Sequence, residues 1–263
     1  MRIALLLAYD GTDFQGFARQ REGRTVQGLL EESLSGLFRV ETRLTGAGRT
    51  DAGVHAVGQV VSFDAPVGMD PAWVASRLNK RLGPEISVRA AVVVPDEFDA
   101  RHSARKRIYE YTLVRSSGPD PFRDRFTLWV VDELDVLAMR HAAKGFLGEH
   151  DFSSFCRRGE GSMVRRVKSI TIKRAGDDLI VRVVADSFCH QMVRSIVGFL
   201  LEVGRGKRDP DEVQMVLARR ERAAAGPVAP AKGLALVEVG YSRRLFLPTS
   251  RSRRYPRRKK EDR

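Results

Sequence analysis

A glycine-rich loop in the first quarter of the chain carries the residue types best suited to chemistry. Residues 46–53 hold three glycines and, among them, Arg49, Thr50 and Asp51 in succession. Glycine permits close backbone approach and positive φ angles, so three of them in eight residues exclude a regular helix or a well-packed strand. An acid beside a base on such a loop is the pattern expected where a carboxylate must stay ionised next to a polyanionic ligand.

The loop does not match the two common phosphate-binding motifs. A dinucleotide fingerprint needs glycine where Asp51 stands, and a P-loop needs Gly-Lys-Ser/Thr, which the loop lacks. Spacing alone is equally compatible with a glycine-rich turn that carries a solvated Arg–Asp pair, because exposed pairs of this kind are common. The choice between a functional and a purely structural loop therefore depends on the rest of the chain.

The elements that must position this loop alternate between strand and helix. Thr25 is suited to cap a helix with one apolar face. Asp70 followed by Pro71 is an N-cap and first-turn pair that opens a second helix. The predicted elements of this half are strands over residues 2–9, 57–63 and 86–94 and helices over 25–38 and 70–82.

A similar mixture recurs in the second half. Alternating polar and apolar residues predict strands over 108–114, 165–174, 179–185 and 234–239, and apolar residues at helical spacing predict helices over 132–147, 188–203 and 211–220. Such a mixture in both halves indicates the α+β class with two similar α/β lobes. We expect an N-terminal lobe over 1–103, which carries the Asp51 loop, a C-terminal lobe over 104–247, and a tail over 248–263.

Composition narrows the class of protein. A hydrophobic fraction of 43% with 30% charged residues is ordinary globular composition and excludes wholesale disorder or a collagen-like chain. No apolar run approaches the roughly 18 residues that a membrane-spanning helix needs. The apolar segment at residues 1–8 is too short for a signal peptide, and Asp10 follows it at once. These features predict a soluble, cytoplasmic protein without a membrane partner.

The positive charge is concentrated at one end of the chain. The formal net charge is +13, from 46 Lys and Arg against 33 Asp and Glu. Residues 241–263 contain ten basic and two acidic side chains, and so carry +8 of that total. Like charges and prolines predict disorder for the tail over 248–263. The charge therefore supports a nucleic-acid partner but does not by itself establish one.

Several sequence blocks resemble one family. Residues 48–56, Gly-Arg-Thr-Asp-Ala-Gly-Val-His-Ala, resemble the signature of the tRNA pseudouridine synthase A family. Further blocks similar to that family follow in its order along residues 8–239: they lie at 8–17, 98–111, 148–155, 188–198 and 231–234. One departure is Phe17, where the family commonly has tryptophan.

The resemblance implies both a reaction and an architecture. Uridine in tRNA is isomerised to pseudouridine, in the anticodon stem-loop at tRNA positions 38, 39 and 40. The family fold has two RRM-like α/β lobes that form a mixed, mainly antiparallel sheet flanked by helices, with the active cleft between the lobes. A homodimer is implied, and neither a metal nor an organic cofactor is expected.

The resemblance also assigns roles to four residues. Asp51 matches the essential aspartate, which acts either as a nucleophile at the sugar or as a base that generates a glycal; the sequence leaves both routes open. Tyr109 matches a tyrosine that stacks on the flipped base, although its position on an alternating strand is also typical of a core aromatic. Arg194 matches the arginine that pairs with the aspartate, and Arg49 the residue that supports the flipped nucleotide.

The remaining polar residues receive simpler interpretations. His55, His141 and His190 lack metal-ligand spacing and are expected to pack or to bond to the backbone. Cys156 and Cys189 are expected to be passive thiols. The candidate phosphate contacts are basic residues in loops or at strand ends: Arg19, Arg21, Arg24, Arg105, Lys106, Arg107, Arg157, Arg158, Arg165 and Arg166.

Two other functions remain alternatives. The first is a non-catalytic RNA-binding protein on two RRM-like lobes, although the strands show no aromatic RNA-binding signature. The second is an N-glycosidase that uses Asp51 to cleave without rejoining. Glycosidases generally place two carboxylates beside the bond, and the loop holds only one.

Overall fold

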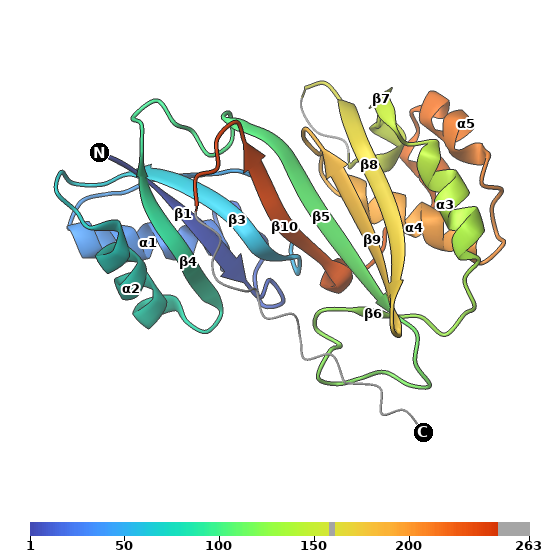
Figure 1. The fold of residues 1–263 in the computed structure, drawn as a ribbon, viewed down its shortest axis with the longest axis horizontal. Helices are drawn as coiled ribbons and strands as arrows, with labels where there is room; N and C mark the ends of the chain where they lie inside the picture. The colour runs from blue at the N-terminus through green and yellow to red at the C-terminus, as the bar shows by residue number, and fades with distance from the viewer. Residues whose placement is uncertain (158–160, 247–263) are drawn as a thin grey trace.

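One ten-stranded sheet runs through the protein, with helices gathered at its two ends (Figure 1). The computed structural model describes residues 1–157 and 161–246. The main strands follow the order β4-β1-β3-β10-β5-β9-β8-β7, with the short strands β2 beside β3 and β6 beside β5. The strands are β1 Arg2–Tyr9, β2 Leu44–Gly46, β3 His55–Asp64, β4 Ile86–Val94, β5 Ala104–Val114, β6 Leu128–Trp129, β7 Gly148–Asp151, β8 Val164–Ala175, β9 Asp178–Ala185 and β10 Leu234–Tyr241.

The helices α1 and α2 belong to the N-terminal end of the sheet and begin where the sequence predicts. The Thr25 hydroxyl accepts a hydrogen bond from the backbone N–H of Gly28, and the Asp70 carboxylate accepts from two N–H groups of the first turn that Pro71 opens. These caps satisfy N–H groups that have no partner within the helix. The helices are α1 Val26–Phe38, α2 Pro71–Leu82, α3 Val136–Lys144, α4 Met192–Gly204 and α5 Glu212–Arg219.

Strand β10 joins the two halves of the sheet. It is the last strand in the sequence, yet it lies between β3 and β5, pairing parallel with β3 and antiparallel with β5. All other main-strand pairs are antiparallel, so the sheet is mixed and mainly antiparallel, as predicted. A continuous apolar core includes Leu5 of β1, Leu30 of α1 and Phe199 of α4. The pairing places the end of the glycine-rich loop directly beside the C-terminal half.

Two predicted helices are longer than the observed ones, and one difference affects the site. The helix predicted over 132–147 is confined to α3, Val136–Lys144. The helix predicted from residue 188 begins at Met192, because Gln191 adopts a left-handed conformation with φ of +65°. Its predicted start is therefore wrong. Residues 188–191 form a loop at the N-terminus of α4, and that loop faces the Asp51 loop.

Some predictions concern residues that the structure does not describe. Others concern features that we expected to be absent. The tail over 248–263 and Arg158 lie outside the described residues. Within residues 1–157 and 161–246, no helix is long and apolar enough to span a membrane. The same residues contain no group of three or more His, Cys, Asp or Glu side chains arranged to hold a metal ion.

Candidate active site

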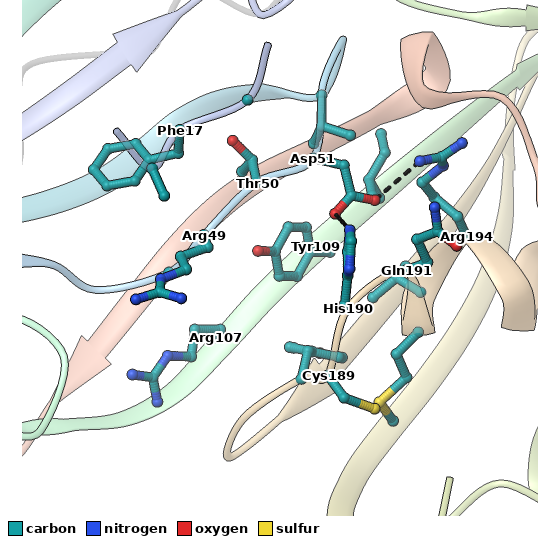
Figure 2. A pocket seen from close by; sticks show the side chains of 18 of the residues that line it. Phe17, Arg49, Thr50, Asp51, Arg107, Tyr109, Cys189, His190, Gln191 and Arg194 are labelled. Carbon is teal, nitrogen blue, oxygen red and sulfur yellow. Dashed lines mark hydrogen bonds and ion pairs between the residues drawn. The ribbon is translucent and has the colours of Figure 1, made fainter. Parts of the chain in front are cut away.

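A pocket of about 800 Å³ lies where the glycine-rich loop meets the C-terminal half of the sheet. The structure brings all four sequence-predicted site residues to its lining, from three separate elements: Asp51 and Arg49 from the loop, Tyr109 from β5 and Arg194 from α4. Figure 2 shows Asp51 above Tyr109, with Arg194 and His190 on one side and Arg49 on the other. The volume of the pocket lies in the range typical of small-ligand sites, about 300–1,000 Å³.

The Asp51 carboxylate lies between an arginine and a histidine. Its Oδ2 accepts a hydrogen bond from Arg194 Nη1 at 2.9 Å, and its Oδ1 lies 3.2 Å from His190 Nε2. The side chains of Asp51 and Arg194 are only 15% and 16% exposed. Arg194 is itself anchored, because its Nε donates to the backbone carbonyl of Ala229 at 2.8 Å. A half-buried carboxylate with a charge-assisted partner is fixed in orientation.

His190 is the site residue that the sequence interpretation missed. We expected packing or a backbone bond for it, whereas its ring faces Asp51 and its side chain is 47% exposed. The error follows from the predicted helix start. We placed residue 190 inside a helix, whereas it lies in the loop before α4. No local signal marked this contact, because Asp51 is distant in the sequence and residue 190 lies outside α4.

Buried polar contacts fix the Asp51 loop from below. The Tyr9 hydroxyl and Thr50 Oγ1 are 2.8 Å apart, and the Phe17 N–H donates to the Thr50 carbonyl at 3.0 Å. The fully buried Gln59 side chain bridges both backbone polar groups of Gly48: its amide oxygen accepts from the Gly48 N–H at 3.2 Å and its amide nitrogen donates to the Gly48 carbonyl at 2.7 Å. Thr50 and Gly48, which lie one and three residues before Asp51, are therefore both anchored.

Two glycines around the loop are required by close approaches. A Cβ on Gly16, whose φ is +94°, would come within 2.9 Å of the Thr50 carbonyl oxygen. A Cβ on Gly46 would lie 2.3 Å from the ring of Phe17. Phe17 is buried and its ring is stacked 6.4 Å from that of Tyr9. The ring that replaces the family's usual tryptophan thus packs beneath the loop.

Tyr109 is both a core aromatic and a pocket residue. It is 7% exposed, belongs to the continuous apolar core, and meets the ring of Phe188 edge-on at 5.0 Å. Burial raises the pKa of Tyr109, and the nearby charge of Asp51 raises it further. The phenol therefore stays protonated near neutral pH. Arg49, by contrast, is exposed at the side of the pocket (Figure 2).

The two cysteines are not separate passive thiols. The structure pairs Cys156 with Cys189 as a disulfide, with Cα atoms 5.8 Å apart. A backbone bond from the Arg157 N–H to the His190 carbonyl, at 2.9 Å, runs beside it. The expectation is wrong because the loop before α4 brings Cys189 to the segment that follows Phe155. Sequence separation gave no sign of that contact.

The candidate phosphate contacts divide into several groups. Arg19 pairs with Glu31 and Arg24 with Glu85, so these two arginines have intramolecular partners. Arg157 and Arg165 line the pocket, and Arg165 Nε is buried without a hydrogen-bond partner within the described residues. Arg107 also lines the pocket but is 9% exposed and bonds only to backbone carbonyls, which does not fit a surface phosphate contact.

Comparison with known proteins identifies the class to which this fold and pocket belong. A family model described as tRNA pseudouridine synthase matches residues 6–103 and 142–242. The chain belongs to this family of tRNA-modifying isomerases. The matched ranges contain Arg49, Asp51 and Arg194, whereas Tyr109 lies in the segment between them.

Individual relatives agree over most of the chain. The tRNA pseudouridine synthase A of Halalkalibacterium halodurans is 45% identical over 236 residues, covering 89% of this chain and 90% of the relative. The proteins of the same name from Leifsonia xyli and Frankia casuarinae are 43% and 46% identical. They cover 91% and 92% of this chain and 91% and 89% of their own length. The family assignment therefore extends to both halves of the protein.

Proposed function

We propose that this enzyme converts uridine to pseudouridine at positions 38, 39 and 40 of the tRNA anticodon stem-loop, with Asp51 as the catalytic residue. The observation that carries the proposal is the Asp51 carboxylate, fixed between Arg194 and His190 and directed into a pocket that Tyr109 also lines. Either route at Asp51 needs a carboxylate in a fixed orientation, and Arg194 Nη1 donates to its Oδ2 at 2.9 Å.

The target uridine must leave its stack to reach Asp51. A base inside a stem is inaccessible, and flipping it out costs a few kcal/mol. The pocket offers compensation in the buried ring of Tyr109, since base–aromatic stacking contributes roughly 1–3 kcal/mol. Arg49 is exposed beside the pocket, where its guanidinium can occupy the space the base leaves and contact the neighbouring phosphate.

The reaction exchanges one bond for another within the same nucleotide. The bond between uracil N1 and C1′ of the ribose breaks, the detached base turns, and a bond between C5 and C1′ replaces it. Asp51 either attacks C1′, forming an ester bond that breaks when C5 bonds to C1′, or removes the C2′ proton to give a glycal, to which that proton returns at C2′ when the C5–C1′ bond forms; both begin from the ionised carboxylate. The C5 proton is then lost and N1 gains one. The Tyr109 phenol, whose pKa burial raises, lines the same pocket and can take part in that exchange as a neutral hydroxyl.

We also propose a cytoplasmic homodimer that binds the anticodon arm of tRNA. The family resemblance supports this assembly. The four predicted site residues line the pocket of a single protomer. We propose that the second protomer extends the contact with the arm.

The experiment that tests this function uses tRNA transcripts carrying tritium at C5 of their uridines. Pseudouridine formation releases the C5 tritium to water, and mapping of the product locates the modified positions. We expect release stoichiometric with pseudouridine at positions 38–40. Binding without release would instead support a non-catalytic RNA-binding protein, and free uracil with abasic RNA would support an N-glycosidase. Modification confined to another arm would contradict the proposed target.

A further inference from the structure

Arg107 lies on β5 two residues before Tyr109, and side chains at this spacing share one face of a strand. Both residues line the pocket (Figure 2). Arg107 is nevertheless almost completely buried, at 9% exposed, so it belongs to the base of the pocket. The side chains that contact Asp51 are Arg194 and His190, so the role of Arg107 needs a separate explanation.

The Arg107 guanidinium bonds to three separate backbone segments. Its Nε and Nη2 both donate to the Ala47 carbonyl, at 3.1 and 2.9 Å. Its Nη1 donates to the Asp186 carbonyl at 2.7 Å, and Nη2 also donates to the Arg101 carbonyl at 2.7 Å. Ala47 begins the catalytic loop, Asp186 begins the segment that leads to His190, and Arg101 lies in the turn between β4 and β5.

These partners are unusual for a buried arginine. Within the described residues, no carboxylate lies within ion-pair distance of Arg107, and the carboxylate of Asp186 is paired with Lys168 instead. Burial lowers the pKa of Arg107, yet an arginine remains charged in proteins. Burying a cation without a counter-ion is costly, so this side chain is poorly explained as a contribution to stability alone.

We propose that Arg107 is a positioning residue that holds the Asp51 loop in register with the segment carrying His190. The guanidinium is a planar fork whose donors point in fixed directions, so its bonds set the separation of the segments it joins. Ala47 lies four residues before Asp51, and Asp186 four before His190. The inference rests on the proposed role of Asp51.

Replacing Arg107 would release both walls of the pocket at once. Three backbone carbonyls would lose a charged donor, and the loop would relax to satisfy the buried carbonyl of Ala47. A displacement of about 1 Å at a reacting group can cost about 100-fold in rate. Affinity for tRNA depends mainly on phosphate contacts spread over the surface, and a mostly buried arginine whose three guanidinium nitrogens all donate to the protein adds little to them. The signature of the role is thus a lower rate of chemistry at nearly unchanged affinity.

Arg140 provides a matched control. It lies on α3, and its Nε and Nη2 donate to a single carbonyl, that of Ile172, at 3.0 and 2.8 Å. This is the geometry that Arg107 uses toward Ala47, but Arg140 does not line the active pocket. Arg140→Met therefore removes the same kind of bond without touching the catalytic loop.

The test compares wild-type protein, Arg107→Met, Arg107→Lys and Arg140→Met. Single-turnover tritium release, the Kd for tRNA and the melting temperature are measured for each. We expect Arg107→Met to react about 100-fold more slowly with a Kd close to wild type. Arg107→Lys, which keeps the charge but not the fork, should fall between the two. Arg140→Met should react at the wild-type rate whatever its melting temperature.

Three results would overturn the inference. One is a rate for Arg107→Met that matches that of Arg140→Met. Another is a raised Kd with an unchanged rate of chemistry, which would make Arg107 an RNA contact. The third is a fully active Arg107→Lys, which would show that charge alone suffices. If Arg107→Met fails to fold, the rate of Arg107→Lys tests the positioning role by itself. An inactive wild-type protein would instead contradict the proposed function.

Discussion

The two walls of the pocket are built in different ways. The N-terminal wall, residues 46–54, is locked by buried groups: Tyr9 bonds to Thr50, and Gln59 bonds to both backbone groups of Gly48. The C-terminal wall, residues 187–194, has a left-handed residue at Gln191 and presents a half-exposed His190 toward Asp51. One wall fixes the position of the carboxylate, and the other supplies the groups that balance its charge.

This division predicts different consequences for changes on each side. Changes behind the N-terminal wall should move Asp51 and lower the rate by modest factors, since several bonds share the task. Changes to the C-terminal wall should remove a charge partner that has no substitute of equal strength. The following predictions probe that difference, from the largest expected effect to the smallest.

Arg194 gives the largest effect. Arg194→Met leaves the half-buried Asp51 without its cation and the Ala229 carbonyl without its donor. A hydrogen bond to a charged group contributes about 1.5–3 kcal/mol, so the single-turnover rate should fall roughly 10- to 150-fold. Arg194→Lys is the control, because it keeps the charge; it should retain more activity than the Met variant. Equal activity in Met and wild-type proteins would remove the C-terminal wall from this role.

Tyr109 lies at the floor between the walls and gives the next effect. Tyr109→Ala should lose the stacking surface for the flipped base, about 1–3 kcal/mol, and should raise the KM for tRNA in proportion. Tyr109→Phe keeps the ring and removes only the hydroxyl. A lower rate with unchanged KM in the Phe variant would assign proton transfer to the phenol, whereas full activity would leave stacking as its only contribution.

Tyr9 tests the N-terminal wall directly. Tyr9→Phe removes the bond to Thr50, which contributes about 0.5–1.5 kcal/mol. We expect a several-fold slower single turnover, smaller than the Arg194 effect. Tyr241 is the matched control, since its hydroxyl donates to the Ala100 carbonyl at 2.8 Å outside the pocket lining. Tyr241→Phe should lower stability by a similar amount and leave the rate intact; the same rate loss in both would refute a local effect.

His55 gives the smallest effect, on stability. Burial lowers the pKa of this ring despite the nearby carboxylate of Asp10. Its Nδ1 accepts from the Gly11 N–H, so the neutral ring bonds to the Lys232 carbonyl through Nε2. The unfolded chain gains a proton at this ring below about pH 6.5, whereas the folded protein gains it only at lower pH, so stability falls as pH drops below about 6.5.

Urea unfolding at pH 5.5 and 7.5 measures this loss. His55→Gln should make the free energy of unfolding less dependent on pH between these values. The wild-type protein, unfolded in parallel at both pH values, serves as the control. An unaltered slope in His55→Gln would show that another group titrates. The measurement bears on the comparison because His55 lies where the loop enters β3, against the C-terminal half.

Local signals in the sequence were enough to predict most elements, whereas the four predicted site residues, all of which line the pocket, came from the family resemblance. Helix α2, for example, begins after Asp70 and ends at Leu82 as expected, because a cap and a first-turn proline define its start. Short strands such as β2 and β7 were missed, since three or four residues give no periodicity.

The missed site residues share a physical cause. His190, Gln59 and Arg107 derive their roles from partners distant in the sequence, and nothing in their own neighbourhoods marks those partners. Arg107 looked like a surface cation because two basic residues precede it, yet the sheet buries it. Gln59 lies on β3 with its side chain fully buried, and its amide bonds to Gly48, which is eleven residues earlier in the chain. Tertiary contacts determined these three positions.

The most direct test of the central claim is tritium release by the wild-type protein and by Asp51→Asn, measured side by side. Asparagine keeps the size of the side chain and removes the charge that either route needs. We predict stoichiometric release by the wild-type protein and none above background by the variant, with tRNA affinity within a few fold of wild type. Release by Asp51→Asn at the wild-type rate would contradict the assignment of the reaction to this carboxylate.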